Sequence, residues 1–426
     1  MRLSALCGLL LLAGCEPNLA LPVKVMAIVP SRSNNYETRQ VELTTPTSAV
    51  HLTGPVISFV GGTQIELNPR DPQLRTYTSE EQLRDLLVKN KGGPVRANFV
   101  DKSGVQWPAD FHTWQMVTTF YNFEQAFLYF QKIYDGKLTA EIKDVQVLYW
   151  GSFVHLGVSD KELRDNAIFY PPVKAFMVVP FEELQKIPFS MNLGVIGHEF
   201  SHLVFNKKVY GGASIPAALD SWTLAPFNLL KGMDEGLADF HGYGVTCGTV
   251  ANGPGCLPNF LSVSFDATRP NDQKLLAERD MTNIDVCMTT ELRNAFNNFT
   301  TSEFLRAGLE YRIGTLIAAS LYQASVPFGK EEQMQKALIE ALDQSSASRP
   351  TGFRQLISLN LQTPQAFTPE LMANTIAAHI SDLPLRKEVC KQLSDRLQLA
   401  CSSFPCAAMP ACDTATRGTR CPIIPQ

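Results

Sequence analysis

Two short motifs carry the residues of this chain that could do metal chemistry. The first places His198, Glu199 and His202 within 191–206, where spaced apolar residues predict a helix. Residues four apart lie on one helical face, so the two histidines can direct their imidazoles at one metal ion. Glu199 lies about 100° round the helix, where its carboxylate can reach a metal-bound water. This H-E-x-x-H spacing predicts a zinc site that activates water. An amphipathic helix with two surface histidines is the alternative.

The second motif, Asp234-Glu235-Gly236-Leu237-Ala238-Asp239, could complete the site. A catalytic zinc takes three protein ligands and keeps a fourth position for water, so a ligand must come from outside the first helix. Glu235 and Asp239 are four residues apart and can face that helix together. Glu235 suits the third ligand, and Asp239 suits an acceptor that orients a ligating histidine. The alternative is an ordinary acidic helix start.

Together these motifs resemble those of the gluzincin metallopeptidases, most closely the thermolysin-like family. That family carries H-E-x-x-H, then N-E-x-x-x-D on a second helix, where this chain has Asp234 in place of the Asn. It also carries Asn-Ala on an edge strand, which matches Asn166 and Ala167. The resemblance covers about residues 111–325. It implies that His198, His202 and Glu235 bind Zn²⁺ and that Asn166 and Ala167 hold a peptide substrate as an added strand.

One departure from the family concerns the donor that stabilises the transition state. No histidine stands where the family has one, at the start of a C-terminal helix that here is expected at 310–322. Tyr311 or Arg312 occupies roughly that place. Related gluzincin aminopeptidases use a tyrosine as oxyanion donor, yet Tyr311 fits equally well as a core aromatic. The other candidate donors are His241, Tyr210 and His379.

The predicted activity is therefore hydrolysis of peptide bonds by a zinc-activated water, with Glu199 as general base. An endopeptidase is favoured, because the G-x-M-E-N type motif with which aminopeptidases bind an N-terminus is not evident. Two alternatives stay open: a non-catalytic zinc-binding lipoprotein on a zincin fold, and an amidase that acts on peptidoglycan stem peptides. Glu199 argues against the first, since a structural zinc has no use for a general base.

The N-terminus predicts export and a lipid anchor. A charged start, an apolar run at 9–12 and small residues before Cys15 are typical of a secretory signal. Leu12-Ala13-Gly14-Cys15 resembles the bacterial lipobox, which implies a lipid on Cys15 and a place in the bacterial cell envelope. Glu16, in place of the Asp of an inner-membrane retention signal, favours the outer membrane. A plain signal peptide with an incidental cysteine is the alternative. No later stretch is apolar enough to span a bilayer.

Cysteine and charge usage agree with this location. Ten cysteines are present, and after Cys7 and Cys15 an even number remains for disulfides in an oxidising compartment. Cys247 with Cys256 would close a Gly- and Pro-rich loop. The net charge of −4, with 18% charged residues and no basic run, argues against nucleic acid as a partner.

The residue pattern predicts the α+β fold class, with a zincin-like catalytic domain of mixed sheet, active-site helix and mostly helical lobe. Strands are predicted at 23–29, 41–45 and 56–60, and a long helix at 111–134. Thr78 with Glu81 predicts a capping box.

Five segments are expected along the chain. They are a signal peptide (1–14), a small β-rich N-terminal domain (15–110), the upper zincin lobe with edge strand and metal helix (111–206), a lower helical lobe with the third zinc ligand (207–385) and a disulfide-rich C-terminal tail (386–426). A removable prosegment is the alternative for the second segment. The long connection at 207–231 predicts a wall or lid over the site.

Overall fold

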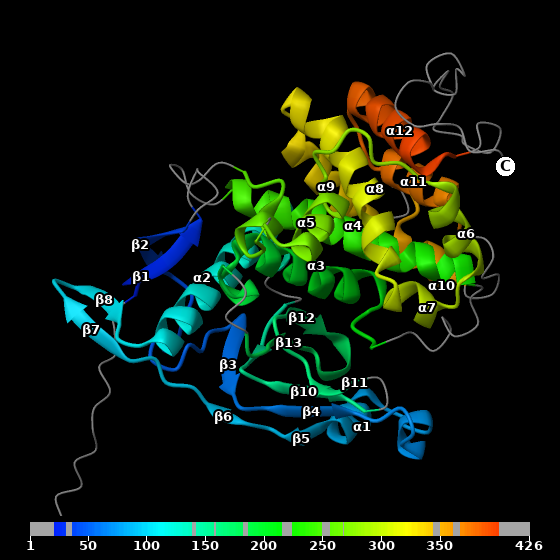
Figure 1. Ribbon diagram of the computed structural model, residues 1–426. Coiled ribbons are helices and arrows are strands. Elements are labelled where there is room, and N and C mark those ends of the chain that lie inside the picture. Colours follow the sequence, from blue (N-terminus) through cyan, green and yellow to red (C-terminus); the bar gives the residue numbers. More distant parts are fainter. Residues whose placement is uncertain are drawn as a thin grey trace, which may run out of the picture.

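The computed structural model combines mixed sheets with a large helical lobe, which is the predicted α+β class (Figure 1). None of the helices in the described part of the chain has both the length and the apolar composition needed to cross a bilayer. The structure describes residues 21–30, 36–138, 142–156, 159–181, 186–214, 224–248, 256–266, 268–343, 350–360 and 367–399.

Strands dominate the first part of the chain and helices the second. The strands are β1 (Val23–Pro30), β2 (Tyr36–Leu43), β3 (Ile57–Gly61), β4 (Gln64–Leu67), β5 (Val88–Asn90), β6 (Gly93–Pro94), β7 (Phe99–Lys102), β8 (Val105–Pro108), β9 (Val145–Tyr149), β10 (Ser152–His155), β11 (Ser159–Glu162), β12 (Ala167–Tyr170) and β13 (Ala175–Val178). The helices are α1 (Glu80–Leu87), α2 (Phe111–Ile133), α3 (Leu193–Val209), α4 (Leu224–Gly248), α5 (Pro270–Glu278), α6 (Thr290–Asn298), α7 (Thr301–Arg306), α8 (Leu309–Ser325), α9 (Glu331–Leu342), α10 (Phe353–Asn360), α11 (Pro369–Ala378) and α12 (Leu383–Leu397).

A five-stranded sheet, in the order β12-β13-β9-β3-β6, supports the helices that carry the motifs. Strands β3, β9 and β13 run parallel, while β12 is antiparallel to β13 and forms one edge. The ring of Phe176 on β13 lies 4.5 Å from that of Phe123 on α2 and stacks at 6.0 Å on that of Phe200 on α3. This aromatic contact fixes α3 against the sheet, because Phe176 and Phe200 are fully buried.

Strands from the segment expected as an N-terminal domain (15–110) pair with strands beyond it in the described part of the chain. Strand β3 pairs with β9 in the central sheet, and β4 pairs with β10. The buried residues of this segment belong to cores shared with the rest of the chain. Alternating apolar residues identify a strand but not its partner strand, so these pairings could not be predicted from the sequence. Removal of 15–110 as a prosegment would take an inner strand out of the central sheet.

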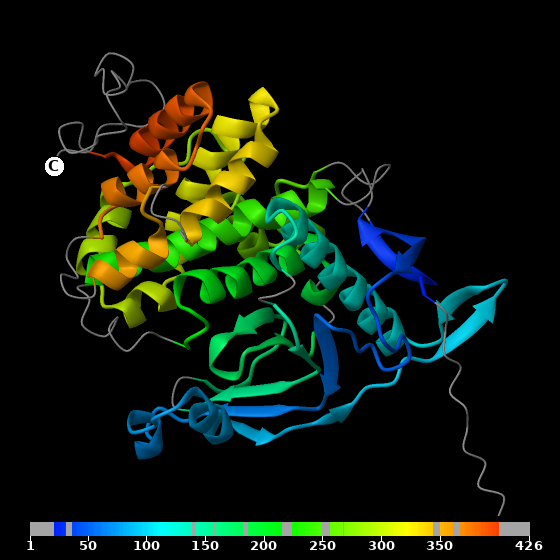
Figure 2. The ribbon, with the colours of Figure 1, turned by 180° about the vertical axis from the view of Figure 1, so that it is seen from behind.

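Two smaller sheets flank the central one. The sheet β2-β1-β8-β7 packs its strand β1 on α2, and the sheet β11-β10-β4-β5 continues below the central sheet (Figure 2). Buried Glu124 of α2 ties the first sheet in place. Its Oε1 accepts hydrogen bonds from the backbone N–H groups of Thr44 and Thr45 at 2.8 and 2.6 Å. Charge-assisted bonds of this kind are stronger than neutral ones.

Helices α3, α4 and α8 lie side by side in the centre of the molecule (Figures 1 and 2). Small residues permit this close approach: a Cβ added at Gly236 of α4 would lie 2.6 Å from the carbonyl oxygen of Gly314 on α8. Cys247 at the end of α4 forms a disulfide with Cys256. Cys287 and Cys390 are also disulfide-bonded.

Several element boundaries differ from the sequence predictions. Helix α1 is capped by Ser79, whose hydroxyl accepts from Gln82 N–H, one residue after the predicted cap. Helix α4 begins at Leu224, so the connection from α3 is shorter than 207–231. The lid predicted there falls largely on 215–223, outside the described residues. Cys15, the signal peptide and the tail beyond 399 also lie outside them.

Candidate metal centre

The start of α3 is held firmly, and this fixes the position of the H-E-x-x-H residues. The side-chain Oδ1 of Asn192 caps the helix by accepting from Gly194 N–H at 3.1 Å. Its Nδ2 donates to the Phe260 carbonyl at 2.8 Å and to Ser264 Oγ at 3.0 Å. A Cβ added at Gly194 would lie 2.3 Å from atoms of Phe260. Glycine at this position is therefore required by packing.

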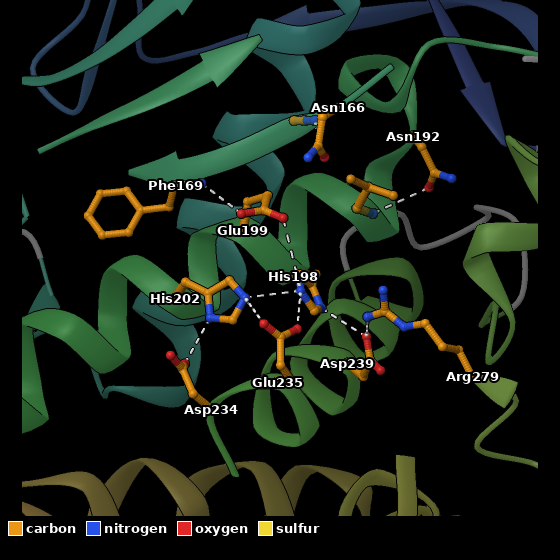
Figure 3. A network of polar contacts seen from close by, with 12 residues as sticks. Asn166, Phe169, Asn192, His198, Glu199, His202, Asp234, Glu235, Asp239 and Arg279 are labelled. Carbon is orange, nitrogen blue, oxygen red and sulfur yellow. Dashed lines mark hydrogen bonds and ion pairs between the residues drawn. The ribbon is translucent and has the colours of Figure 1, made fainter. Parts of the chain in front are cut away.

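The two Nε2 atoms of His198 and His202 and both carboxylate oxygens of Glu235 come together between α3 and α4 (Figure 3). The Nε2 atoms of the two histidines are 3.0 Å apart. Glu235 Oε2 lies 3.3 Å from His198 Nε2, and Glu235 Oε1 lies 3.6 Å from His202 Nε2. His198, Glu199 and His202 also form a group whose ligand atoms all lie within 4.8 Å of one another. This cluster could hold a metal ion.

Each histidine is oriented by its own carboxylate on α4. His198 Nδ1 lies 2.9 Å from Asp239 Oδ1, and His202 Nδ1 lies 2.8 Å from Asp234 Oδ1. Both rings therefore keep Nε2 for the shared point. The sequence predicts this role for Asp239 but not for Asp234. The order of the motifs could have revealed the role of Asp234. In two antiparallel helices the earlier residue of one faces the later residue of the other, so His198 faces Asp239 and His202 faces Asp234.

Arg279, at the end of α5, is a site residue that the sequence did not reveal. Its Nη2 lies 2.5 Å from Asp239 Oδ1, and its guanidinium carbon lies 4.4 Å from the centre of the Tyr311 ring. Burial alone would raise the pKa of the Asp239 carboxyl, but the charges of Arg279 and His198 lower it. Arg279 thus keeps the carboxylate that orients His198 ionised.

The electrostatics of the cluster favour a cation between the two histidines. Burial alone would lower the pKa of His202, yet the Asp234 and Glu235 carboxylates raise it to about 10. Burial would raise the pKa of Glu235, yet His202 and His198 lower it to about 2. Positive charge is thus stabilised at the point where the ligand atoms meet, which is the electrostatic condition for binding a metal ion.

Glu199 lies between the ligand atoms and the edge strand β12. Its Oε2 accepts a hydrogen bond from Phe169 N–H at 2.7 Å, while its Oε1 lies 4.0 Å from His198 Nε2. Burial raises the pKa of this carboxyl, and the two histidines oppose that effect. The carboxylate is therefore held beside the ligands by a backbone bond, with one oxygen directed at the cluster.

Asn166 and Ala167 lie at the start of the same edge strand. The side-chain Oδ1 of Asn166 accepts from Ala167 N–H at 2.9 Å, and its carbonyl accepts from Val179 N–H at 3.4 Å. In an antiparallel pair, alternate residues direct their backbone groups away from the partner strand. Ala167 therefore directs its carbonyl to the same outer edge as the Phe169 N–H that bonds Glu199.

Of the candidate donors, Tyr311 is the one whose hydroxyl is influenced by the charges of both Glu235 and Glu199. The charge of Glu235 raises the pKa of its hydroxyl, with burial and Glu199 adding to this and Arg279 opposing it. Glu310, beside it, is buried, and burial raises the pKa of its carboxyl to about 7. Arg312, by contrast, influences exposed Glu291. Hydrogen bonds to the backbone and Thr289 lower the pKa of the Glu291 carboxyl most, and the charge of Arg312 lowers it further.

The structure does not bring His241 to the cluster. Six residues after Glu235 on the same helix, it is rotated by about 240° and faces α2 instead. Its Nδ1 lies 2.9 Å from the Tyr129 hydroxyl, and its ring lies 5.1 Å from that of Phe130. We therefore do not retain His241 as an oxyanion donor. Tyr210 packs its ring on Phe205, and His379 bonds the Thr375 carbonyl at the end of α11.

Because His241 is buried, we expect the folded chain to lose stability as the pH falls. Burial lowers its pKa from 6.5 to about 3. Between these values the unfolded chain binds a proton that the folded chain does not, so the free energy of unfolding falls as pH falls. From about pH 7 to about pH 5, the stability of wild type relative to His241→Gln should drop by about 2 kcal/mol. Urea unfolding at the two pH values measures this difference. His155→Gln, at a half-exposed position on β10, should show no such drop.

Comparisons with known proteins supply no family for this chain. It matches none of the protein-family models against which it was scanned, and none of the curated proteins. The site itself consists of two oriented imidazoles, an adjacent carboxylate, and a second carboxylate between these groups and the edge strand β12.

Proposed function

We propose that this chain is a gluzincin-type zinc peptidase, with His198, His202 and Glu235 as the zinc ligands. The main support for this proposal is that these three side chains lie within contact distance of one another. Tetrahedral zinc with bonds of about 2.0–2.2 Å needs ligand atoms roughly 3.3–3.5 Å apart. The two Nε2 atoms lie 3.0 Å apart, and they lie 3.3 and 3.6 Å from the Oε2 and Oε1 atoms of Glu235, so these separations bracket that range. Glu235 Oε2 is buried, and the polar group nearest to it in the ion pairs of this cluster is His198 Nε2, at 3.3 Å.

Zinc bound there supplies a Lewis acid that lowers the pKa of water and polarises the scissile carbonyl. The residues of the chain do the rest of the chemistry. Glu199 takes a proton from the attacking water on Oε1 and delivers it to the leaving amine. Its raised pKa suits this exchange, because a base that must later act as an acid needs a pKa nearer neutrality. The Tyr311 hydroxyl donates a hydrogen bond to the developing oxyanion.

The substrate that fits this arrangement is an extended peptide. Strand β12 ends the central sheet, and its outer edge carries the Ala167 carbonyl beside Glu199. A peptide added as a further strand along this edge would place its backbone next to the ligand atoms. We further propose that the chain is exported and anchored by a lipid on Cys15 in the bacterial envelope, which rests on the lipobox resemblance alone.

Chelation tests the proposed activity. The purified chain should hydrolyse an unspecific substrate such as dye-labelled casein, lose this activity with phenanthroline, and recover it on addition of zinc. The non-chelating isomer of phenanthroline should have no effect. A chain that holds one zinc per molecule but cleaves neither casein nor a peptide library would favour the non-catalytic lipoprotein instead.

A further inference from the structure

A second polar pocket lies at the end of the central sheet, away from the metal centre. Its cavity of about 220 Å³ lies where β12 ends and where β9 and β13 begin, against the last turns of α3. Phe169, Val173 and Leu203 supply apolar lining. The charged lining is Arg84, Lys143, Asp144, Lys174 and Lys207.

The four cations come from four separate parts of the fold. Arg84 belongs to α1, Lys143 precedes β9, Lys174 connects β12 to β13, and Lys207 belongs to α3. Within the part of the chain that the structure describes, none of them has a carboxylate at ion-pair distance. Neighbouring Lys208 differs, because its Nζ lies 3.3 Å from Asp343 Oδ2. Four cations and one carboxylate, Asp144, therefore share one small cavity.

The charge of Lys174 acts on Lys207. Lys207 is half-buried, and burial together with the charge of Lys174 lowers the pKa of its ammonium group. Lys174 itself has a φ of 52°, in the left-handed region, and Asp144 has a φ of 55°. Such backbone is unfavourable for a residue other than glycine and is common at ligand sites. Arg84 is positioned by its bond from Nη2 to Gln146 Oε1 at 3.1 Å.

We propose that this pocket binds a phosphate-type oxyanion. Cations that approach from several sides match a tetrahedral anion with several oxygens and more than one charge, whereas a carboxylate offers two oxygens and one charge. The ligand can be free inorganic phosphate or the phosphate group of a monoester. Lys207 follows Glu199 by eight residues, about 12 Å along α3, so the cations lie apart from the metal ligands even though Phe169, which lines the pocket, also bonds Glu199. The proposal does not depend on the proposed peptidase activity.

Calorimetric titration of the full chain with inorganic phosphate, against sodium chloride of equal ionic strength, tests the proposal. Wild type should bind one phosphate saturably. The double variant Lys174→Gln with Lys207→Gln should bind at least about tenfold more weakly, because it loses two of the cations. A matched control replaces exposed Lys274 and Lys391, on α5 and α12, with Gln and should bind as wild type does.

Further titrations decide the assignment. Phosphate can also bind a metal ion, so the titration is repeated on Glu235→Ala, which should keep wild-type phosphate affinity. Loss of binding in that variant would assign the phosphate to the metal centre and overturn the proposal. Equal affinity in the Lys174 and Lys207 double variant, or no saturable binding by wild type, would overturn it as well. Titration with glycerol phosphate then distinguishes the sources: binding as tight as that of inorganic phosphate indicates a monoester ligand, and weaker binding indicates the free anion.

Discussion

Replacing Glu199 with Gln should lower the turnover of a peptide substrate by about 100- to 10,000-fold, the contribution typical of a general base. The amide cannot take a proton from water, although its carbonyl oxygen can still accept the bond that Phe169 N–H now makes to Glu199 at 2.7 Å. The ligands are untouched, so the zinc content should stay at that of wild type. Steady-state kinetics and metal analysis on the same preparation measure both quantities.

The value of this variant lies in the separation of chemistry from folding. Glu81→Gln makes the same chemical change on the exposed side of α1 and should leave turnover unchanged. Full activity in Glu199→Gln would exclude Glu199 as general base. A joint loss of activity and zinc would instead indicate that Glu199 maintains the site, since its carboxylate lies 4.0 Å from His198 Nε2.

The second large effect concerns the metal. Glu235→Ala should weaken zinc binding by at least about 100-fold, because the loss of even an outer partner of a ligand typically costs 10- to 100-fold. The variant keeps both imidazoles but removes the carboxylate that contacts them at 3.3 and 3.6 Å. Competition with a chromophoric chelator gives the affinity, and circular dichroism checks that the helices persist.

Two milder variants serve as controls for this prediction. Asp234→Asn and Asp239→Asn retain the size of the side chains that contact His202 and His198, so each should weaken zinc binding less than Glu235→Ala does. An unchanged zinc content in Glu235→Ala would rule it out as a ligand. Equal losses in all three variants would mean that the carboxylates act through charge alone and not through coordination.

Much of the centre could be predicted because it follows from the period of a helix. His198 and His202, like Glu235 and Asp239, are four residues apart, and this spacing alone places each pair on one face. The periodic spacing of apolar residues likewise predicted the start of α2 at 111 and the bounds of strands β1 and β3 to within a residue or two. These features depend on neighbours in sequence, so one chain is enough to read them.

Contacts between distant segments could not be predicted in this way. Arg279 lies 40 residues from Asp239 in sequence, and nothing in the spacing of either residue connects them. The choice of Tyr311 over Arg312 depends on how α8 is turned against α4. His241 follows the second motif closely, yet the rotation of α4 directs it into the aromatic core formed with α2.

The sequence by itself determined the residue types, the two helical faces and the chemistry that they can support. Only the tertiary structure decided that β3 joins the sheet whose edge strand bonds Glu199, that Asp234 orients His202, and that four cations meet at the far end of α3. The physical reason is the same in each case. Helical and strand periods act over a few residues, whereas strand pairing, helix rotation and charge clustering depend on packing between segments far apart in the chain.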